Sequence, residues 1–170
     1  MRNKVLIYGS WILGVILLQS ILRPISIFGV KPNLIVIFVT IVGLLRNNVE
    51  ASIIGLILGA LLDVITGKTI GFYSLLGLYL GAISGSLNKK FYRDNVFVAM
   101  LMVFLFTMLY EFAVYIFGVY VQHQGDVWYA MTRVILPEAV YNSVVSIFIF
   151  GLVLKMSYIF ERQGERIRRY

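Results

Sequence analysis

Six long apolar runs separated by short polar segments make up the chain, and this pattern constrains its fold more than any other feature. Of the 170 residues, 60% are hydrophobic and 14% are charged, whereas a soluble domain has about 25% charged residues. A helix needs about 20 apolar residues to cross a bilayer. The sequence therefore predicts an all-α, polytopic membrane protein with one domain over residues 1–170. Its six predicted transmembrane helices are 5–22, 33–46, 51–65, 70–87, 96–121 and 134–154, followed by a basic cytoplasmic tail, 155–170.

The first run follows Arg2 and Lys4, as the apolar core of a secretory signal peptide would. No small-residue cleavage site comes after it, and Arg23 and Pro24 stand there instead. We therefore expect this run to be retained as the first helix.

The second and third runs are short, with 13 and 15 residues between their flanking polar residues. Two alternatives fit these lengths: the helices recruit polar residues at their ends, or they are half-helices that enter and leave on one side. Both alternatives return the chain to the same side of the membrane.

Lysine and arginine are distributed unequally between the two sides of the predicted membrane domain. With six crossings, 11 of the 15 basic residues fall on the side of both termini and 4 on the other. Cytoplasmic loops carry the excess of Lys and Arg. We therefore expect both termini to be cytoplasmic. The longest external loop is then 122–133, which contains Trp128 and Tyr129.

The net charge of +7 does not indicate nucleic-acid binding here, because the charges lie between apolar runs. The C-terminal tail contains four arginines, and anionic lipid attracts basic residues near the membrane surface. This tail fits a topology anchor, and a cytoplasmic protein contact is the alternative.

Glycines at four-residue spacing mark one face of the third predicted helix and one face of the fourth. Such spacing lets a neighbouring backbone approach closely. The glycine faces fit packing within this chain, and docking of another membrane protein is the alternative. The residues are Gly55 and Gly59 in the third helix and Gly77, Gly81 and Gly85 in the fourth.

Acidic residues inside apolar helices are expensive in hydrocarbon and usually face protein or a wet cavity. Asp63 lies one turn beyond Gly59 and fits either contact with the headgroups or a helix cap. Glu111 lies inside the fifth run and fits an interior hydrogen bond, a ligand or ion site, or a partner contact. In the sixth run, Pro137 suits a first helical turn. A polar patch of Glu138, Tyr141 and Asn142 follows it.

The residues needed for most enzymes and metal sites are missing from the sequence. With no cysteine and a single histidine, His123, the chain cannot build a His/Cys metal site. No nucleophile elbow, zinc-protease motif or phosphate-binding glycine loop occurs. We therefore expect no catalytic residues, no metal and no cofactor.

Several short motifs in this order resemble MreD, the family of rod shape-determining membrane proteins of bacteria. Each motif is weak alone, but their order and spacing are fairly specific, and the match spans nearly the whole chain. The residues that carry it are Pro32 with Asn33, Arg46, Glu50, Asp63 after the Gly55 and Gly59 pair, Gly71, and Pro137 with Tyr141 and Asn142.

The resemblance implies a non-enzymatic component of the cell-wall elongation machinery in the bacterial cytoplasmic membrane. Such a protein binds the bitopic protein MreC and works with the MreB filament. It also works with the polymerase RodA and its class B penicillin-binding protein in lateral peptidoglycan synthesis.

The MreD fold is similar to the substrate-binding S-components of energy-coupling-factor vitamin transporters, which also have six helices. An S-component that captures a small molecule is therefore the alternative function. Because a shared fold does not decide function, the resemblance favours the scaffold and leaves the alternative open.

Overall fold

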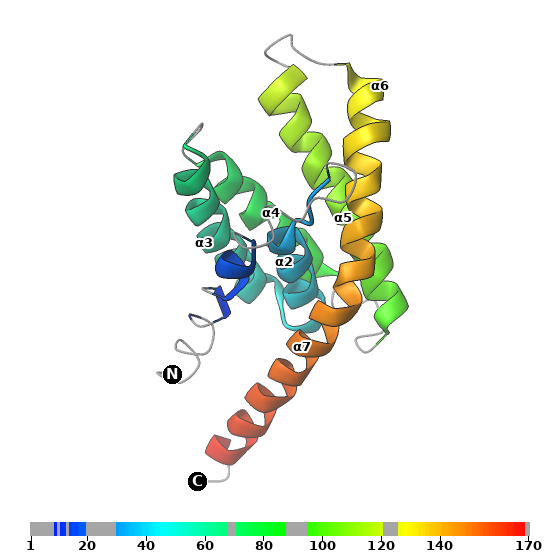
Figure 1. Ribbon diagram of the computed structural model, residues 1–170. Helices are drawn as coiled ribbons and strands as arrows, with labels where there is room; N and C mark the ends of the chain where they lie inside the picture. The colour runs from blue at the N-terminus through cyan, green and yellow to red at the C-terminus, as the bar shows by residue number, and fades with distance from the viewer. Residues whose placement is uncertain are drawn as a thin grey trace.

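The computed structural model describes residues 9, 11–12, 14–19, 30–67, 71–87, 95–120 and 126–168. Within these ranges every element is helical (Figure 1). The described residues of the first predicted helix, 5–22, are helical, and its other residues lie outside the described part of the chain. The elements are α2 (Leu34–Leu45), α3 (Asn48–Thr66), α4 (Phe72–Ser86), α5 (Val96–Tyr115), α6 (Val127–Ala130) and α7 (Leu136–Arg168), with the π-helical segments η1 (Ile116–Tyr120) and η2 (Met131–Ile135).

Helix α2 lies at the centre of the molecule, between the α3–α4 pair and the α5–α7 pair (Figure 1). All twelve of its residues are buried. A helix that is apolar on every side is stable in such a position because all of its faces meet other helices. At 1.5 Å per residue α2 is about 18 Å long, whereas the hydrocarbon core is about 30 Å thick. The central helix is therefore shorter than the hydrocarbon core is thick.

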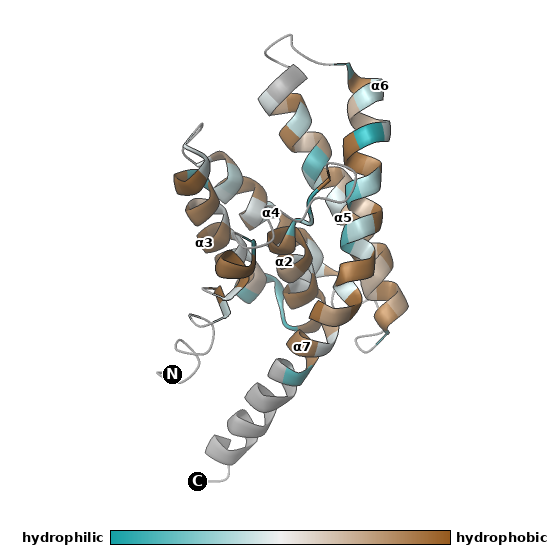
Figure 2. Ribbon diagram, viewed as in Figure 1, coloured by the Kyte–Doolittle hydropathy of each residue, from teal (hydrophilic) through white to brown (hydrophobic). Residues whose placement is uncertain are grey.

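The outer faces of the surrounding helices are apolar and exposed, as lipid contact requires. Val64 of α3 and Phe97 of α5 are each 80% exposed, and Phe148 of α7 is 74% exposed. Figure 2 shows hydrophobic residues along most of α3, and more hydrophilic turns on α6 and the adjoining part of α7. Three helical stretches are long and apolar enough to span a membrane: Asn48–Thr66, Val96–Gly118 and Val127–Lys155. The predicted all-helical, polytopic membrane architecture is confirmed to this extent, and the count of six crossings stays a prediction.

Helix α3 begins earlier than the apolar pattern indicates. The side chain of Asn47 accepts a hydrogen bond from the Glu50 N–H at 2.8 Å and caps the helix. Asparagine is among the preferred N-cap residues. Helix α3 therefore includes Asn48, Val49 and Glu50, and its 19 residues correspond to the alternative in which a short run recruits a polar end.

Two glycines with positive φ shape the turn between α3 and α4. Gly67 (φ 64°) ends α3, and Gly71 (φ 95°) precedes the first residue of α4. Because side chains other than hydrogen disfavour this backbone region, glycine suits both positions. Helix α4 starts at Phe72, whereas the predicted helix starts at residue 70.

The last helical stretch starts at Val127, and the prediction that it begins at residue 134 is wrong. Asp126 caps α6 by accepting a hydrogen bond from the Trp128 N–H at 2.9 Å. Trp128 and Tyr129, predicted to lie in an external loop, are therefore helical, with 75% and 64% of their surfaces exposed. Aromatic residues at a helix end suit the membrane–water interface.

Pro137 is consequently preceded by helix and does not begin it. Proline has no N–H to donate, and its ring crowds the carbonyl of the residue four positions earlier. The wider π-helical turn of η2 directly precedes this position, as is common where the α-helical ladder is interrupted. Beyond residue 154, α7 continues to Arg168, so most of the predicted tail is helical.

Candidate functional site

Asp63 is a cap for helix α4. The residue is 2% exposed, and its carboxylate accepts hydrogen bonds from the N–H groups of Gly71, Tyr73 and Ser74 at 2.9–3.0 Å, as well as from the Ser74 hydroxyl. The first N–H groups of a helix have no partner within the helix, and a carboxylate satisfies them while complementing the helix dipole. Of the two alternatives for Asp63, the structure shows the helix cap.

The predicted glycine faces of α3 and α4 lie against each other. A methyl group on Gly55 would collide with the carbonyl of Gly77, and one on Gly77 with the carbonyl of Gly55. Gly59 meets the Tyr73 backbone in the same way, while Gly81 and Gly85 meet the backbones of Ala51 and Asn48. Each glycine face covers the other, so neither is open to a separate partner.

Gly43 of α2 extends this close packing to the central helix. A side chain there would meet Ser84 and the backbone N of Gly85 on α4. Gly43 stands alone in its run without the four-residue spacing, so no sequence pattern marks it as a packing residue.

A cleft of about 380 Å³ opens above the N-terminal end of α2. It exists because the neighbouring helices extend further than α2. Glu111 lies nine positions before the end of η1 at Tyr120, or about 13 Å along the helix. Glu138 lies eleven positions after the start of α6 at Val127, or about 16 Å. Glu111 and Glu138, which line the cleft, therefore lie well inside their helices and not at the helix ends.

Two predicted intramembrane acids, Glu111 and Glu138, converge in this cleft. The Asn33 side-chain amide donates to Glu111 Oε1 at 2.9 Å. Glu138 lines the same cleft, and its carboxyl group interacts electrostatically with that of Glu111. Of the alternatives for Glu111, the structure shows an interior hydrogen bond, and it places this bond at the wall of an open cleft.

The floor of the cleft is the capped start of α2. Pro32 is buried, and its carbonyl accepts a hydrogen bond from the Gln19 side chain at 3.1 Å. Gln19 also accepts from the Leu34 N–H at 2.8 Å, and Asn33 caps the Val36 N–H. The role of Gln19 could not be read from the sequence, because nothing local links it to residues 13 and 15 positions later.

Asn142, on α7, completes this cap. Its side-chain oxygen accepts from the Asn33 N–H at 2.9 Å, and its amide donates to the Thr107 hydroxyl of α5 at 3.3 Å. Asn142 is fully buried. Its neighbour Tyr141 is half-buried, and nothing in the structure explains its presence in the motif.

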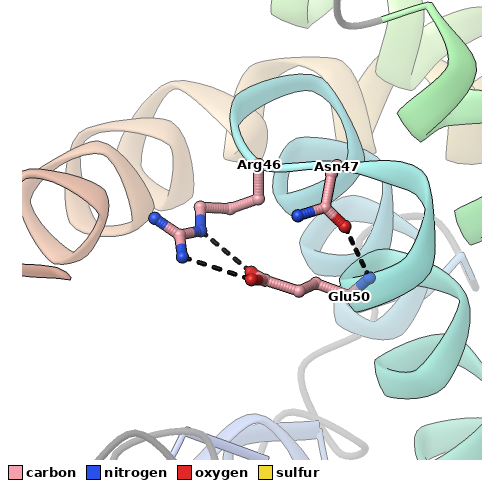
Figure 3. Close-up of polar contacts among 3 residues, drawn as sticks. All are labelled: Arg46, Asn47 and Glu50. Atoms are coloured by element: carbon pink, nitrogen blue, oxygen red, sulfur yellow. Dashed lines mark hydrogen bonds and ion pairs between the residues drawn. The ribbon is translucent and has the colours of Figure 1, made fainter. Parts of the chain in front are cut away.

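Arg46 and Glu50 lie away from the cleft, where α2 ends and α3 begins. The Arg46 guanidinium contacts both carboxylate oxygens of Glu50, at 2.9 and 3.3 Å, and Asn47 caps the helix beside this ion pair (Figure 3). The ion pair and the cap together hold the turn between the two helices.

The motif residues thus occupy helix ends and helix contacts throughout the membrane domain. A family model described as rod shape-determining protein MreD matches residues 2–158. The chain belongs to the MreD family. No curated protein and no solved structure matches it. Membership in MreD confirms the resemblance and indicates a role in rod-shape determination, whereas similarity to vitamin-transporter S-components stays a prediction.

Within this MreD protein, the described residues form no group of three His, Cys, Asp or Glu side chains able to hold a metal ion. The cleft instead combines two carboxyl groups, amide groups and apolar walls. Such a combination binds and orients a partner or ligand group.

Proposed function

We propose that this protein is a non-enzymatic membrane scaffold of the cell-wall elongation complex. It binds MreC and supports lateral peptidoglycan synthesis and rod shape. The observation that carries this proposal is the MreD family match, which extends over residues 2–158. The family is defined by shape determination, and its motif residues serve helix packing in this fold.

The proposed setting is the bacterial cytoplasmic membrane, with both termini in the cytoplasm. The excess of Lys and Arg on the side of the termini supports this orientation. The other proposed partners are the MreB filament on the cytoplasmic side and RodA with its class B penicillin-binding protein in the membrane. Exposed apolar side chains on α3, α5 and α7 provide surfaces suited to neighbouring helices as well as lipid.

Co-purification tests the proposed scaffold. The tagged protein is isolated from its native membrane in mild detergent, and bound proteins and small molecules are identified by mass spectrometry. Recovery of MreC or a peptidoglycan polymerase is the expected result. An unrelated polytopic protein with the same tag and expression level is the control. Equal recovery of MreC with that control contradicts the proposal.

The cleft favours a second candidate function, that of a small-molecule-binding S-component. Its volume of about 380 Å³ and its converging polar groups are those of a small ligand site. In the same experiment, this function predicts co-purification of an ATPase pair with its transmembrane coupler, or of a bound vitamin, in place of MreC.

A further inference from the structure

Among the described residues, no basic side chain forms an ion pair with the carboxyl groups of Glu111 and Glu138. Between described residues the only ion pair is Arg46–Glu50, which lies away from the cleft. Lys31 lines the cleft and is exposed, yet it forms no ion pair with either glutamate. Acidic groups within a membrane domain are normally paired with a base or line a polar cavity, and this pair lines the cleft.

Tyr110 supplies an independent sign that a ligand group is missing. The residue is 4% exposed, and its hydroxyl is buried without a hydrogen-bond partner. It lines the same cleft as Glu111, Glu138 and Tyr73. Buried hydroxyls almost always have a partner, and a phenol can both donate and accept.

The shape and lining of the cleft define the group that fits. Its walls combine the carboxyl groups with the apolar side chains of Ile35, Leu62, Val114 and Val134. A volume of about 380 Å³ exceeds what a bare metal ion occupies and suits an organic group. A charged head on an apolar stem satisfies both parts of the lining, as the side chains of Lys and Arg do elsewhere.

We propose that this cleft binds an ammonium or guanidinium group carried on an apolar stem. The cationic head contacts the carboxyl groups of Glu111 and Glu138, and the stem lies along the apolar wall. The Tyr110 hydroxyl, which is buried beside the cleft, turns to accept a hydrogen bond from one N–H of the head. The same chemistry is offered by a Lys or Arg side chain of a partner polypeptide and by a free small amine.

A charge-matched pair of probes tests the proposal on the full chain in detergent. The cationic probe is Nα-acetyl-lysine methylamide, and the neutral probe is Nα-acetyl-norleucine methylamide, at equal ionic strength. Thermal unfolding is followed as each probe is titrated. A ligand that binds the folded state raises Tm with concentration. Only the cationic probe should give a saturable rise, and equal shifts with both probes would overturn the proposal.

Variants locate the site. Glu138→Gln and Glu111→Gln should each raise the half-saturating concentration of the cationic probe by about tenfold or more, because each removes a charge-assisted contact. Tyr110→Phe should weaken the binding without unfolding the protein, since it removes only an unpaired hydroxyl. Glu50→Gln, which changes a carboxylate away from the cleft, should leave it unchanged. Unaltered binding in all three cleft variants would refute the assignment even if the wild type binds the probe.

Photo-crosslinking in cells distinguishes the two sources. A photoreactive amino acid replaces Val134, which is 44% exposed and lines the cleft. A protein adduct that disappears in the Glu138→Gln background assigns the cation to a partner polypeptide. Absence of such an adduct, together with retained probe binding, assigns it to a free amine.

The inference is separable from the proposed scaffold function. If MreC co-purifies while the cationic probe fails to bind, the scaffold proposal is supported and the cation site is refuted. If the probe binds and MreC does not co-purify, the cation site is supported and the scaffold proposal is refuted.

Discussion

The backbone N–H of Asn33 donates a hydrogen bond of 2.9 Å to the side-chain oxygen of Asn142, 109 positions later in the chain. This bond ties the start of the central helix α2 to α7. Both residues belong to motifs that the sequence presents far apart, and the fold brings them together at the floor of the cleft. The two motifs therefore form a single structural unit.

Replacing Asn142 should destabilise this unit. Asn142→Leu keeps the branched side-chain shape but leaves the Asn33 N–H and the Thr107 hydroxyl without their partner. Each unsatisfied buried group costs about 1–3 kcal/mol. Thermal unfolding in detergent should show a Tm several degrees lower. Val140→Leu, at a position 49% exposed on the same helix, should shift Tm by much less. Comparable shifts would mean that the bond contributes little.

Removing the carboxylate of Asp63 should weaken the start of α4. Asp63→Ala leaves three N–H groups and the Ser74 hydroxyl unpaired, whereas Asp63→Asn keeps one oxygen acceptor. We expect the alanine variant to lose more than about 2 kcal/mol, and the asparagine variant to lose less. Asp126→Ala is the matched control because Asp126 caps only the exposed helix α6. The expected order of Tm is Asp126→Ala, Asp63→Asn, then Asp63→Ala, from highest to lowest.

Enlarging the glycines between α3 and α4 should prevent their packing. Gly59→Leu places a side chain where the Tyr73 backbone lies, and overpacking costs about 1–3 kcal/mol or more when backbone cannot move aside. We expect aggregation or a strongly reduced folded yield in size-exclusion chromatography. Gly151→Leu is the control, since nothing lies within 4 Å of that position. A normal profile for Gly59→Leu would rule out the close contact.

The two substitutions Glu111→Gln and Glu111→Leu should behave differently. Glutamine retains an oxygen that accepts the hydrogen bond from the Asn33 amide, whereas leucine leaves that amide unsatisfied at the wall of the cleft. The glutamine variant should unfold near the wild-type Tm, and the leucine variant should unfold at a lower temperature. The interior hydrogen bond is unimportant if the two variants unfold together.

Topology can be measured with single cysteines because the natural chain has none. A membrane-impermeant thiol reagent added to intact spheroplasts should label Gln124→Cys and leave Phe91→Cys unlabelled. Both positions should react after membrane lysis, which controls for local accessibility. The reverse pattern would invert the proposed orientation.

Hydropathy predicts a helical membrane protein because this fold class can be recognised from long apolar runs alone. It does not reveal which helix is central. Lipid and protein interior are both apolar, so the buried faces of α2 resemble the lipid-facing sides of α3 and α5 in the sequence. The burial of every residue in α2 appears only when the other helices surround it.

The sequence predicts a side chain's role where the residue and its hydrogen-bond partners lie close together in the chain. Asp63 and the turn that it caps are within eleven positions, and a helix cap is one of the alternatives that the sequence offers. The grouping of Asn33, Glu111 and Glu138 depends on contacts between separate helices, and it could not be read from spacing. The sequence also does not predict the π-helical segment before Pro137, because a proline suits a first helical turn as well as an interrupted helix.

The short length of α2 also has an electrical consequence. At the centre of the molecule, the apolar barrier between the floor of the cleft and the opposite side is a helix of about 18 Å, thinner than the surrounding hydrocarbon of about 30 Å. In the proposed orientation, with water filling the cleft, the membrane voltage would fall more steeply along α2 than across the adjacent lipid. Moving one charge through the whole field changes its energy by about 2.3 kcal/mol per 100 mV. The proposed cationic group would cross a share of this field on its way to Asn33, and its occupancy of the cleft would then depend on membrane potential.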